Sequence, residues 1–293
     1  MVIRTVLCPL DFSALSIGEL ELAVGLCRAS GARLVLHHNL SDAGPGAGMR
    51  WMWLQERNGL IPNPDPEILL RGLLESLPDD LEAEAVITRG LAAPAILAVQ
   101  ERLRADLLLL GTHGATSDEH ASVTERVVLE SKRPVLVLHE GRLDGSISFA
   151  PPGLDRPWSV LVPTDLTADS EACVRYAMEL AATWSVRVDL LHVVETAYPG
   201  PHGDARLRIE ESVGRRLMEL VPEELERVVD CHVRFGDPTT EIATAADILD
   251  PQAIVIGNHA RGPLRRFFTR DTSRGVLHGT HHPTWIVPAR WAA

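Results

Sequence analysis

Apolar residues in this chain follow two alternating patterns. Short runs rich in branched apolar residues are typical of strands buried on both faces of a sheet. Between them lie longer segments with apolar residues at helical spacing. In the first half, the predicted strands are 2–7, 34–38, 83–88, 107–110 and 135–138. The predicted helices are 13–28, with Ser13 as N-cap, and 93–103.

The second half repeats this alternation. Its predicted strands are 159–162, 187–193, 228–234, 253–256 and 284–287, and its predicted helices are 168–183, 203–220 and 239–249. Strands that alternate with helices predict an α/β fold with a mainly parallel sheet and right-handed crossovers.

The two halves are also similar residue by residue. "VLCPLDFS" from Val6 recurs as "VLVPTDLT" from Val160, and "RLVLHH" from Arg33 recurs as "RVDLLHVV" from Arg187. The segments 89–114 and 131–138 recur at 235–260 and 279–288, in the same order. This order indicates a duplicated unit of about 140 residues, an ordinary domain size. We therefore predict domains at 1–141 and 158–293, joined by a Gly- and Pro-rich linker at 142–157.

Composition narrows the possible functions. The net charge of −12 argues against a protein that coats nucleic acid, which requires a basic surface. The sequence has no run of eighteen apolar residues, so no membrane span is predicted. The start of the chain has no basic lead or cleavage site, and the four cysteines form no CxxC motif. We expect reduced, buried thiols and a cytoplasmic location.

Each half resembles a universal stress protein domain, and the whole chain resembles a tandem member of that family. The resemblance rests on the strand-one ending P-x-D-[FL]-[ST], the strand-two ending L-H, the entry to the 93–103 helix, "ADLLLLGTHG" and "RPVLVL". It implies two tandem five-stranded sheets related to the adenine-nucleotide α-hydrolase fold. It also implies an intrachain pseudo-dimer that pairs strands 135–138 and 284–287, and a dimer of tandem chains is a further possibility.

In the first half, the resemblance implies a partly preserved ATP site. Nucleotide-binding members share a loop of the form G-x2-G-x9-G-[ST], whose glycines and helix N-terminus approach the phosphates. Here only six residues separate Gly114 from Ala121, so the loop is three residues short, and it carries Asp118 and Glu119. The implied site residues are Pro9, Asp11, His38, Gly111, His113, Gly114, Ser122 and Val123.

In the second half, the loop keeps the length of the family motif, but other residues replace its second glycine and its hydroxyl residue. Ala260 replaces the second glycine, and Asp271 at the hydroxyl position competes with phosphate for helix N–H groups. The degenerate equivalents are Pro163, Asp165, Gly257, His259, Arg270 and Asp271. Nearby Arg261, Arg265, Arg266 and Arg270 form either an anion patch or a solvated loop paired with acids.

Several other residues have two interpretations. Asp11 and Asp165 recur at strand ends, either as ribose contacts or as turn residues. His37 and His192 are expected at the end of strand two, as the family's L-H dipeptide. The twelve histidines include no spacing typical of a metal site, and adjacent Cys231 and His232 are predicted to face opposite sides of a strand.

Three functional hypotheses follow. The first is a stress-response regulatory or binding protein with degenerate ATP loops and no catalytic residues, since no nucleophile motif is present. The second is an ATP-binding protein that hydrolyses ATP slowly in its first half. The third is a carrier or scaffold for an anionic or apolar ligand, using the arginine stretch or 41–65. The overlapping segment 50–66 is either a partner surface or a packed helix start.

Overall fold

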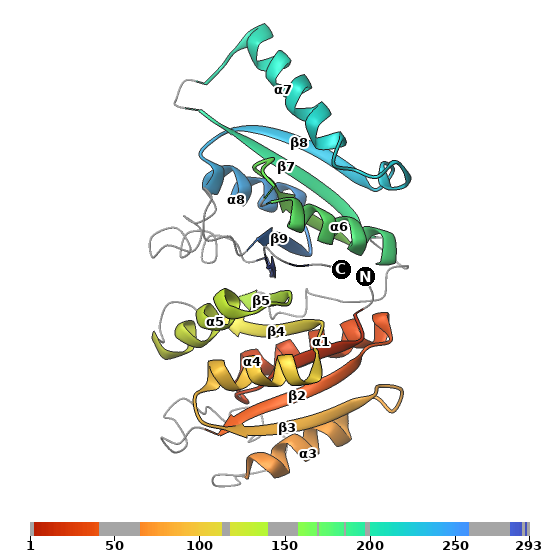
Figure 1. Ribbon diagram of the computed structural model, residues 1–293, viewed down its shortest axis with the longest axis vertical. Helices are drawn as coiled ribbons and strands as arrows, with labels where there is room; N and C mark the ends of the chain where they lie inside the picture. Colours follow the sequence, from red (N-terminus) through yellow and green to blue (C-terminus); the bar gives the residue numbers. More distant parts are fainter. Residues whose placement is uncertain are drawn as a thin grey trace. The chain divides into compact units, whose positions relative to one another are not determined.

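The computed structural model describes residues 3–40, 65–112, 118–139, 158–168, 170–184, 186–196, 200–257, 282–288 and 291. The chain forms two compact units, Val2–Pro151 and Pro152–Ala293, called here the first and second units. Each unit is an α/β structure whose strand pairs are all parallel (Figure 1). The predicted α/β class is therefore confirmed, whereas the pseudo-dimer stays a prediction.

The first unit has strand order β3-β2-β1-β4-β5. Its elements are β1 (Thr5–Pro9), α1 (Ala14–Ser30), β2 (Arg33–Leu40), α3 (Pro66–Ser76), β3 (Ala83–Arg89), α4 (Ala92–Leu103), β4 (Leu107–Thr112), α5 (Asp118–Glu130) and β5 (Val135–His139). Most strands extend one to three residues beyond their predicted carboxyl ends, because the apolar runs predict the buried middle of a strand better than its end.

The second unit has strand order β10-β9-β6-β7-β8 and repeats the plan of the first. Its elements are β6 (Ser159–Pro163), α6 (Glu171–Trp184), β7 (Arg187–Glu195), α7 (Gly203–Met218), η1 (Glu223–Leu225), β8 (Val229–Gly236), α8 (Pro238–Leu249), β9 (Ala253–Gly257) and β10 (Thr284–Val287). In both units, sequence-adjacent strands one and two pair at the centre, so their carboxyl ends meet at one edge of the sheet.

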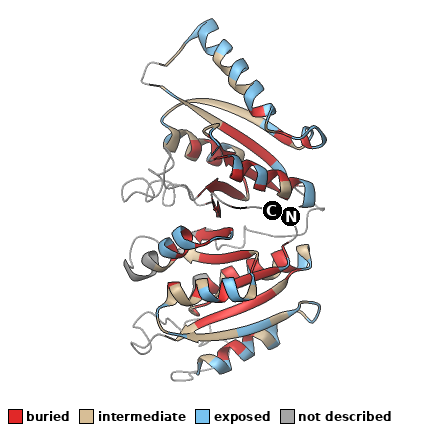
Figure 2. Cartoon of the chain, in the orientation of Figure 1, coloured by how far each residue is buried: buried red, intermediate tan, exposed pale blue. Residues whose placement is uncertain are grey.

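Burial differs between central and edge strands. All residues of β6, β9 and β10 are buried, as are the first four of β1 (Figure 2). Strands β3 and β8 end their sheets and have half-buried or exposed residues along most of their length. The prediction that 83–88 is buried on both faces is therefore wrong, because a strand pattern does not reveal which strand has only one neighbour.

Helix ends follow capping chemistry. The predicted cap is confirmed, since Ser13 Oγ accepts a hydrogen bond from Ser16 N at 3.2 Å. Helix α3 was not predicted as a separate element, although Asp65 caps it and Pro66 occupies its first turn, a recognisable start signal. Helix α6 begins three residues later than predicted, after the turn that follows β6.

Candidate functional site

The turn after the first strand of each unit is closed by an aspartate. Asp11 Oδ1 accepts a hydrogen bond from Ser13 N at 2.9 Å. Asp165 Oδ1 accepts from the backbone N of Thr167 at 3.0 Å and from its hydroxyl at 2.6 Å. Both aspartates therefore act as turn residues, as one interpretation of the sequence expected. A turn role does not use all the acceptor sites of a carboxylate.

The residue after each aspartate has a left-handed backbone. Phe12 has φ 62° and Leu166 has φ 60°. Residues other than glycine rarely adopt this backbone region. The strained backbone costs about 1–3 kcal/mol for each such residue, and residues of this kind cluster at functional sites. The duplicated turn thus places a strained residue beside an aspartate at the carboxyl edge of each sheet.

A histidine from the second strand fixes each turn from the other side. His38 Nδ1 lies 2.7 Å from the carbonyl oxygen of Leu10, and His192 Nδ1 lies 2.8 Å from that of Thr164. These two histidines are therefore structural equivalents. The family's L-H dipeptide was assigned to His37 and His192, but in "LHH" it is His38 that occupies the position of His192, as the alignment of the two repeats from Arg33 and Arg187 implies.

In the first unit, polar side chains of this edge bond to one another. His37 Nε2 lies 2.8 Å from Thr88 Oγ1, which donates to Asn39 Oδ1 at 3.0 Å. Asn39 Nδ2 in turn donates to the Gly90 carbonyl at 2.8 Å. Because the Thr88 hydrogen is used by Asn39, His37 Nε2 must donate. This chain ties the end of β2 to the end of β3.

The two adjacent histidines, His37 and His38, are held neutral near pH 7. Burial, followed by the charges of His38 and Arg102, lowers the pKa of His37 to about 4. Burial also lowers the pKa of His38, although its bond to Leu10 and the charge of Asp11 act in the opposite direction. His38 packs against Phe12 with ring centroids 4.6 Å apart.

A buried acid that the sequence reasoning missed lies beneath the same edge. Glu19 on α1 is 4% exposed. Burial raises the pKa of its carboxyl well above 4.5, the charge of Asp11 raises it further, and a hydrogen bond from the Gly111 backbone opposes both. The Gly111 carbonyl accepts from Thr124 Oγ1 at 2.9 Å. The sequence does contain a signal for the burial of Glu19, because the matching position of the second repeat is occupied by an apolar residue, Cys173.

In the second unit, the same edge forms a pocket of about 290 Å³. It lies at the carboxyl ends of β6 and β7, beside the start of α8. Its walls are mainly apolar, with an aspartate, a glutamate and a histidine among them. The lining residues are Pro163, Thr164, Asp165, Leu191, His192, Val193, Val194, Glu195, Pro238 and Ile242.

The Asp165 carboxyl in this pocket is ionised at neutral pH. Burial raises its pKa, but hydrogen bonds from the side chains of Thr167 and Ser170 and from backbone groups outweigh burial. The net result is a pKa below the ordinary 3.8. The pocket therefore has a fixed negative charge on one wall.

Most of the predicted phosphate loops lie outside the described residues. Pro9 and Gly111 lie in β1 and β4, Val123 lies in α5, and Pro163 and Gly257 end β6 and β9. Ser122 belongs to α5, but its side chain is not described. The calls that fall outside the described residues are His113, Gly114, His259, Arg261, Arg265, Arg266, Arg270, Asp271 and almost all of 50–66.

Both units of the chain are similar to known proteins. The family model for the universal stress protein family matches residues 3–139 and 159–288, one segment in each unit. The chain belongs to the universal stress protein family. Both halves of the chain carry the family's pattern, as the internal repeat predicted.

Relatives support this membership to different extents. A universal stress protein of Mycolicibacterium smegmatis (strain ATCC 700084 / mc(2)155) is 30% identical over 144 residues, covering 44% of this chain and 48% of that protein. The match thus spans about half the length of that relative. A universal stress protein structure from Archaeoglobus fulgidus DSM 4304 is 18% identical, with a TM-score of 0.64, and covers 97% of this chain and 96% of that one. A putative universal stress protein from Pseudomonas aeruginosa UCBPP-PA14 is 14% identical, with a TM-score of 0.61, and covers 98% and 93%. At these identities the two structures support the fold alone.

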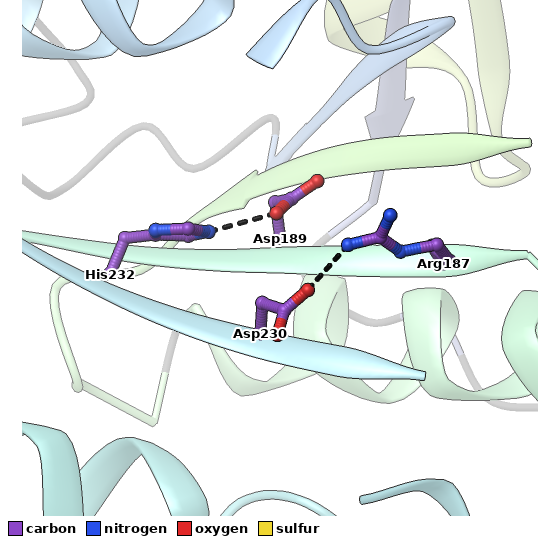
Figure 3. A network of polar contacts seen from close by, with 4 residues as sticks. All are labelled: Arg187, Asp189, Asp230 and His232. Carbon is purple, nitrogen blue, oxygen red and sulfur yellow. Dashed lines mark hydrogen bonds and ion pairs between the residues drawn. The ribbon is translucent and has the colours of Figure 1, made fainter. Parts of the chain in front are cut away.

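A separate polar network of this universal stress protein lies near the amino ends of β7 and β8 (Figure 3). His232 Nε2 lies 2.8 Å from Asp189 Oδ1, and Arg187 donates to Asp230 at 2.6 Å. Cys231 lies on the opposite face, with its sulfur 3.4 Å from that of Met218, so the predicted divergence of Cys231 and His232 is confirmed.

The described ranges contain no group of three or more His, Cys, Asp or Glu side chains that could hold a metal ion. No helix within those ranges is long and apolar enough to cross a membrane. Three of the four free thiols are buried, and Cys231 is half-buried.

Proposed function

We propose that this universal stress protein is a regulatory binding protein that holds a small molecule in the pocket of its second unit. The observation that carries the proposal is the pocket itself, at the carboxyl ends of β6 and β7. Open α/β sheets bind ligands at this edge. Its volume of about 290 Å³ is near the lower end of the range for small-molecule sites, about 300–1,000 Å³.

The comparison between units supports the second unit as the binding unit. In the first unit, His37 and Asn39 belong to the hydrogen-bonded chain that ends at Gly90. The matching residues of the second unit are Leu191 and Val193, which line the pocket. Apolar walls with a few polar groups are typical of ligand sites. The proposal therefore favours the unit whose loop sequence is less similar to an ATP motif.

Blocking the pocket tests this proposal. We would measure the melting temperature of the full chain with adenosine, AMP and ATP, before and after Val193→Trp. At least one probe should raise the melting temperature, because a ligand that binds only the folded state stabilises it. Val193→Trp should abolish that rise, since the indole fills the pocket.

The control is Val233→Trp, because Val233 is an equally half-buried strand residue that does not line the pocket. It should leave the ligand effect intact. If none of the three probes raises the melting temperature, or if the rise survives Val193→Trp, the proposal is wrong. Loss of the rise only in an Asn39→Trp variant would instead favour the ATP hypothesis for the first unit.

A further inference from the structure

We infer that β8 pairs, through its outer edge, with the same strand of a second copy of this chain, in an antiparallel arrangement about a two-fold axis. The outer edge is the side of β8 that faces away from β7. Strand β8 ends the sheet of the second unit, and among the described residues β7 is its one strand neighbour (Figure 1). Such an edge presents a row of backbone donors and acceptors to another strand.

The parallel ladder shows which backbone groups face the outer edge. Val188 N donates to the Val228 carbonyl at 2.8 Å, and Val188 is level with Val229. In a parallel pair, alternate residues of a strand turn their backbone groups to the same neighbour. The even-numbered residues of β8 therefore bond to β7. The odd-numbered residues turn their backbone groups to the outer edge, and these are Val229, Cys231, Val233 and Phe235.

The side chains of β8 are complementary to those of the same strand read in reverse. An antiparallel pair centred on His232 places Asp230 opposite Arg234 of the second copy, twice by symmetry. It also places apolar residues opposite apolar ones, Val229 with Phe235 and Cys231 with Val233. Opposite charges and apolar side chains directly across a strand pair both stabilise it. In this register the odd-numbered residues form the hydrogen-bonded pairs, as their backbone groups require.

The charges that meet in this pair are already oriented by ion pairs within the chain. Arg187 donates to Asp230 at 2.6 Å, and Arg234 lies 3.3 Å from Glu241. A carboxylate has about four acceptor sites and a guanidinium has about five donors, so each group can also bind a second partner. In the dimer these ion pairs join into one row across the new strand pair.

The matching edge of the first unit lacks this complementarity. Strands β2 and β3 have the register of β7 and β8, so Val86 occupies the position of His232. An antiparallel pair centred on Val86 places Glu84 opposite Thr88 and Ala83 opposite Arg89. Opposite charges do not meet across the residues of β3. The comparison therefore favours β8 as the edge that pairs with a second copy.

Helix α7 supplies apolar contact beside the same edge. The sulfur of Met218 lies 3.4 Å from that of Cys231, so this side of α7 faces β8. Met218 is 37% exposed and Leu207 is 57% exposed, and both share a helix face with Gly214, beside which a side chain would meet open space. Because α7 contacts both β7 and β8, pairing of the edges brings two copies of α7 about two strand spacings apart. That separation is about 10 Å, an ordinary distance for packed helices.

Sedimentation velocity of the full chain over a concentration series tests this inference. The wild type should form a dimer, with twice the chain mass of 32.0 kDa. Asp230→Arg and Arg234→Asp should each raise the dissociation constant at least about tenfold, because each brings like charges together twice. An equimolar mixture of the two variants should dimerise again, since each variant then faces the opposite charge in the other.

Proline variants give a second test if charge reversal weakens folding. Val233→Pro removes an N–H that faces the outer edge and that β7 does not use, so it should abolish the dimer and leave a folded monomer. The control is Ile87→Pro at the matching half-buried position of β3, which should leave the dimer intact. A wild type that stays monomeric throughout the series overturns the inference. So does a dimer that survives Val233→Pro, or a mixture of folded charge variants that stays monomeric.

Discussion

The two units carry different side chains on equivalent pairs of strands, β2 with β3 and β7 with β8. In the first unit, Val35 of β2 is fully buried, and Val86 lies nearby on β3. In the second, the matching residues are Asp189 and His232, whose side chains meet at 2.8 Å. The backbone register is the same, because Val35 pairs with Glu84 and Asp189 with Asp230. A duplicated sheet can thus carry apolar residues in one copy and a hydrogen-bonded polar pair at the matching positions of the other, when both residues change.

The first helices of the two units also differ at one buried position. Glu19 of α1 is a buried acid, whereas Cys173 of α6 is a buried apolar thiol at the matching position. At the ligand edge, His37 and Asn39 are matched by Leu191 and Val193. The strands and helices follow from periodicity, which both halves share. The chemistry differs at a few positions of the sheet and of the first helix, where the two units carry different side chains.

The largest effect is expected when half of the second unit's pair is placed in the first. Val35→Asp puts a carboxylate at a fully buried position without its histidine. We expect a loss of about 4 kcal/mol in the free energy of unfolding, measured by urea denaturation. Val35→Asp with Val86→His should recover at least about 1 kcal/mol of that loss.

The reciprocal variants in the second unit should show smaller losses. His232→Val leaves Asp189 unpaired but adjacent to a side chain that was 31% exposed, so water can reach the site. We expect a loss of about 2 kcal/mol. Asp189→Val with His232→Val should be within about 1 kcal/mol of the wild type. Simple additivity of the single losses would contradict the claim that the two residues act as a pair.

The strained turns should respond differently to glycine. Phe12 and Leu166 share a left-handed backbone, but Phe12 is 2% exposed whereas Leu166 is half-buried. Phe12→Gly relieves strain but removes a buried ring, so we expect a net loss of about 3 kcal/mol in unfolding free energy. Leu166→Gly should stay within about 1 kcal/mol of the wild type, because relief of strain offsets a smaller packing loss. Equal losses of the two variants in calorimetric unfolding would contradict the claim that burial of the Phe12 ring makes the difference.

Glu19 should make the stability of the first unit depend on pH. Its pKa in the folded chain lies well above the ordinary 4.5, so the folded state keeps a proton that the unfolded chain has released. The contribution of Glu19 to stability is therefore full below pH 4.5 and is lost as pH rises towards the folded pKa, by about 1 kcal/mol for each pH unit.

Glu19→Gln removes this titration and keeps a hydrogen-bond acceptor for Gly111. Urea denaturation at several pH values should show the variant about 2 kcal/mol more stable than the wild type near pH 7, and similar to it near pH 4. Glu19→Cys, which introduces the residue of the second unit, should lose the same pH slope. An unchanged slope in either variant would mean that other groups cause it.

The sequence predicted the elements of this fold better than its site. Every predicted strand has a counterpart, because apolar runs and the internal repeat constrain strands twice. The pocket could not be predicted, because it depends on how residues at the ends of β6 and β7 and at the start of α8 come together, and these segments lie far apart in the sequence. In the first unit, the register of β2 and β3 is hidden by the long segment between them, so the hydrogen-bonded chain from His37 to Gly90 is visible only in the structure. The aspartate of each turn was found because it recurs, and Glu19 was missed because it does not.

The smallest effect should come from an ion pair that occurs at the same position in each unit. Arg33 pairs with Glu84 at 3.2 Å, and Arg187 pairs with Asp230 at 2.6 Å, at matching positions. All four side chains are at least 33% exposed, so water screens both pairs. We expect Glu84→Gln and Asp230→Asn each to cost less than about 1 kcal/mol in urea denaturation. A larger loss only for Asp230→Asn would show that Arg187 and Asp230 stabilise the neighbouring pair of Asp189 and His232, and that the network acts as one unit. Equal small losses would mean that the recurring ion pair contributes little, and that the energetic difference between the units lies in the buried positions that diverged.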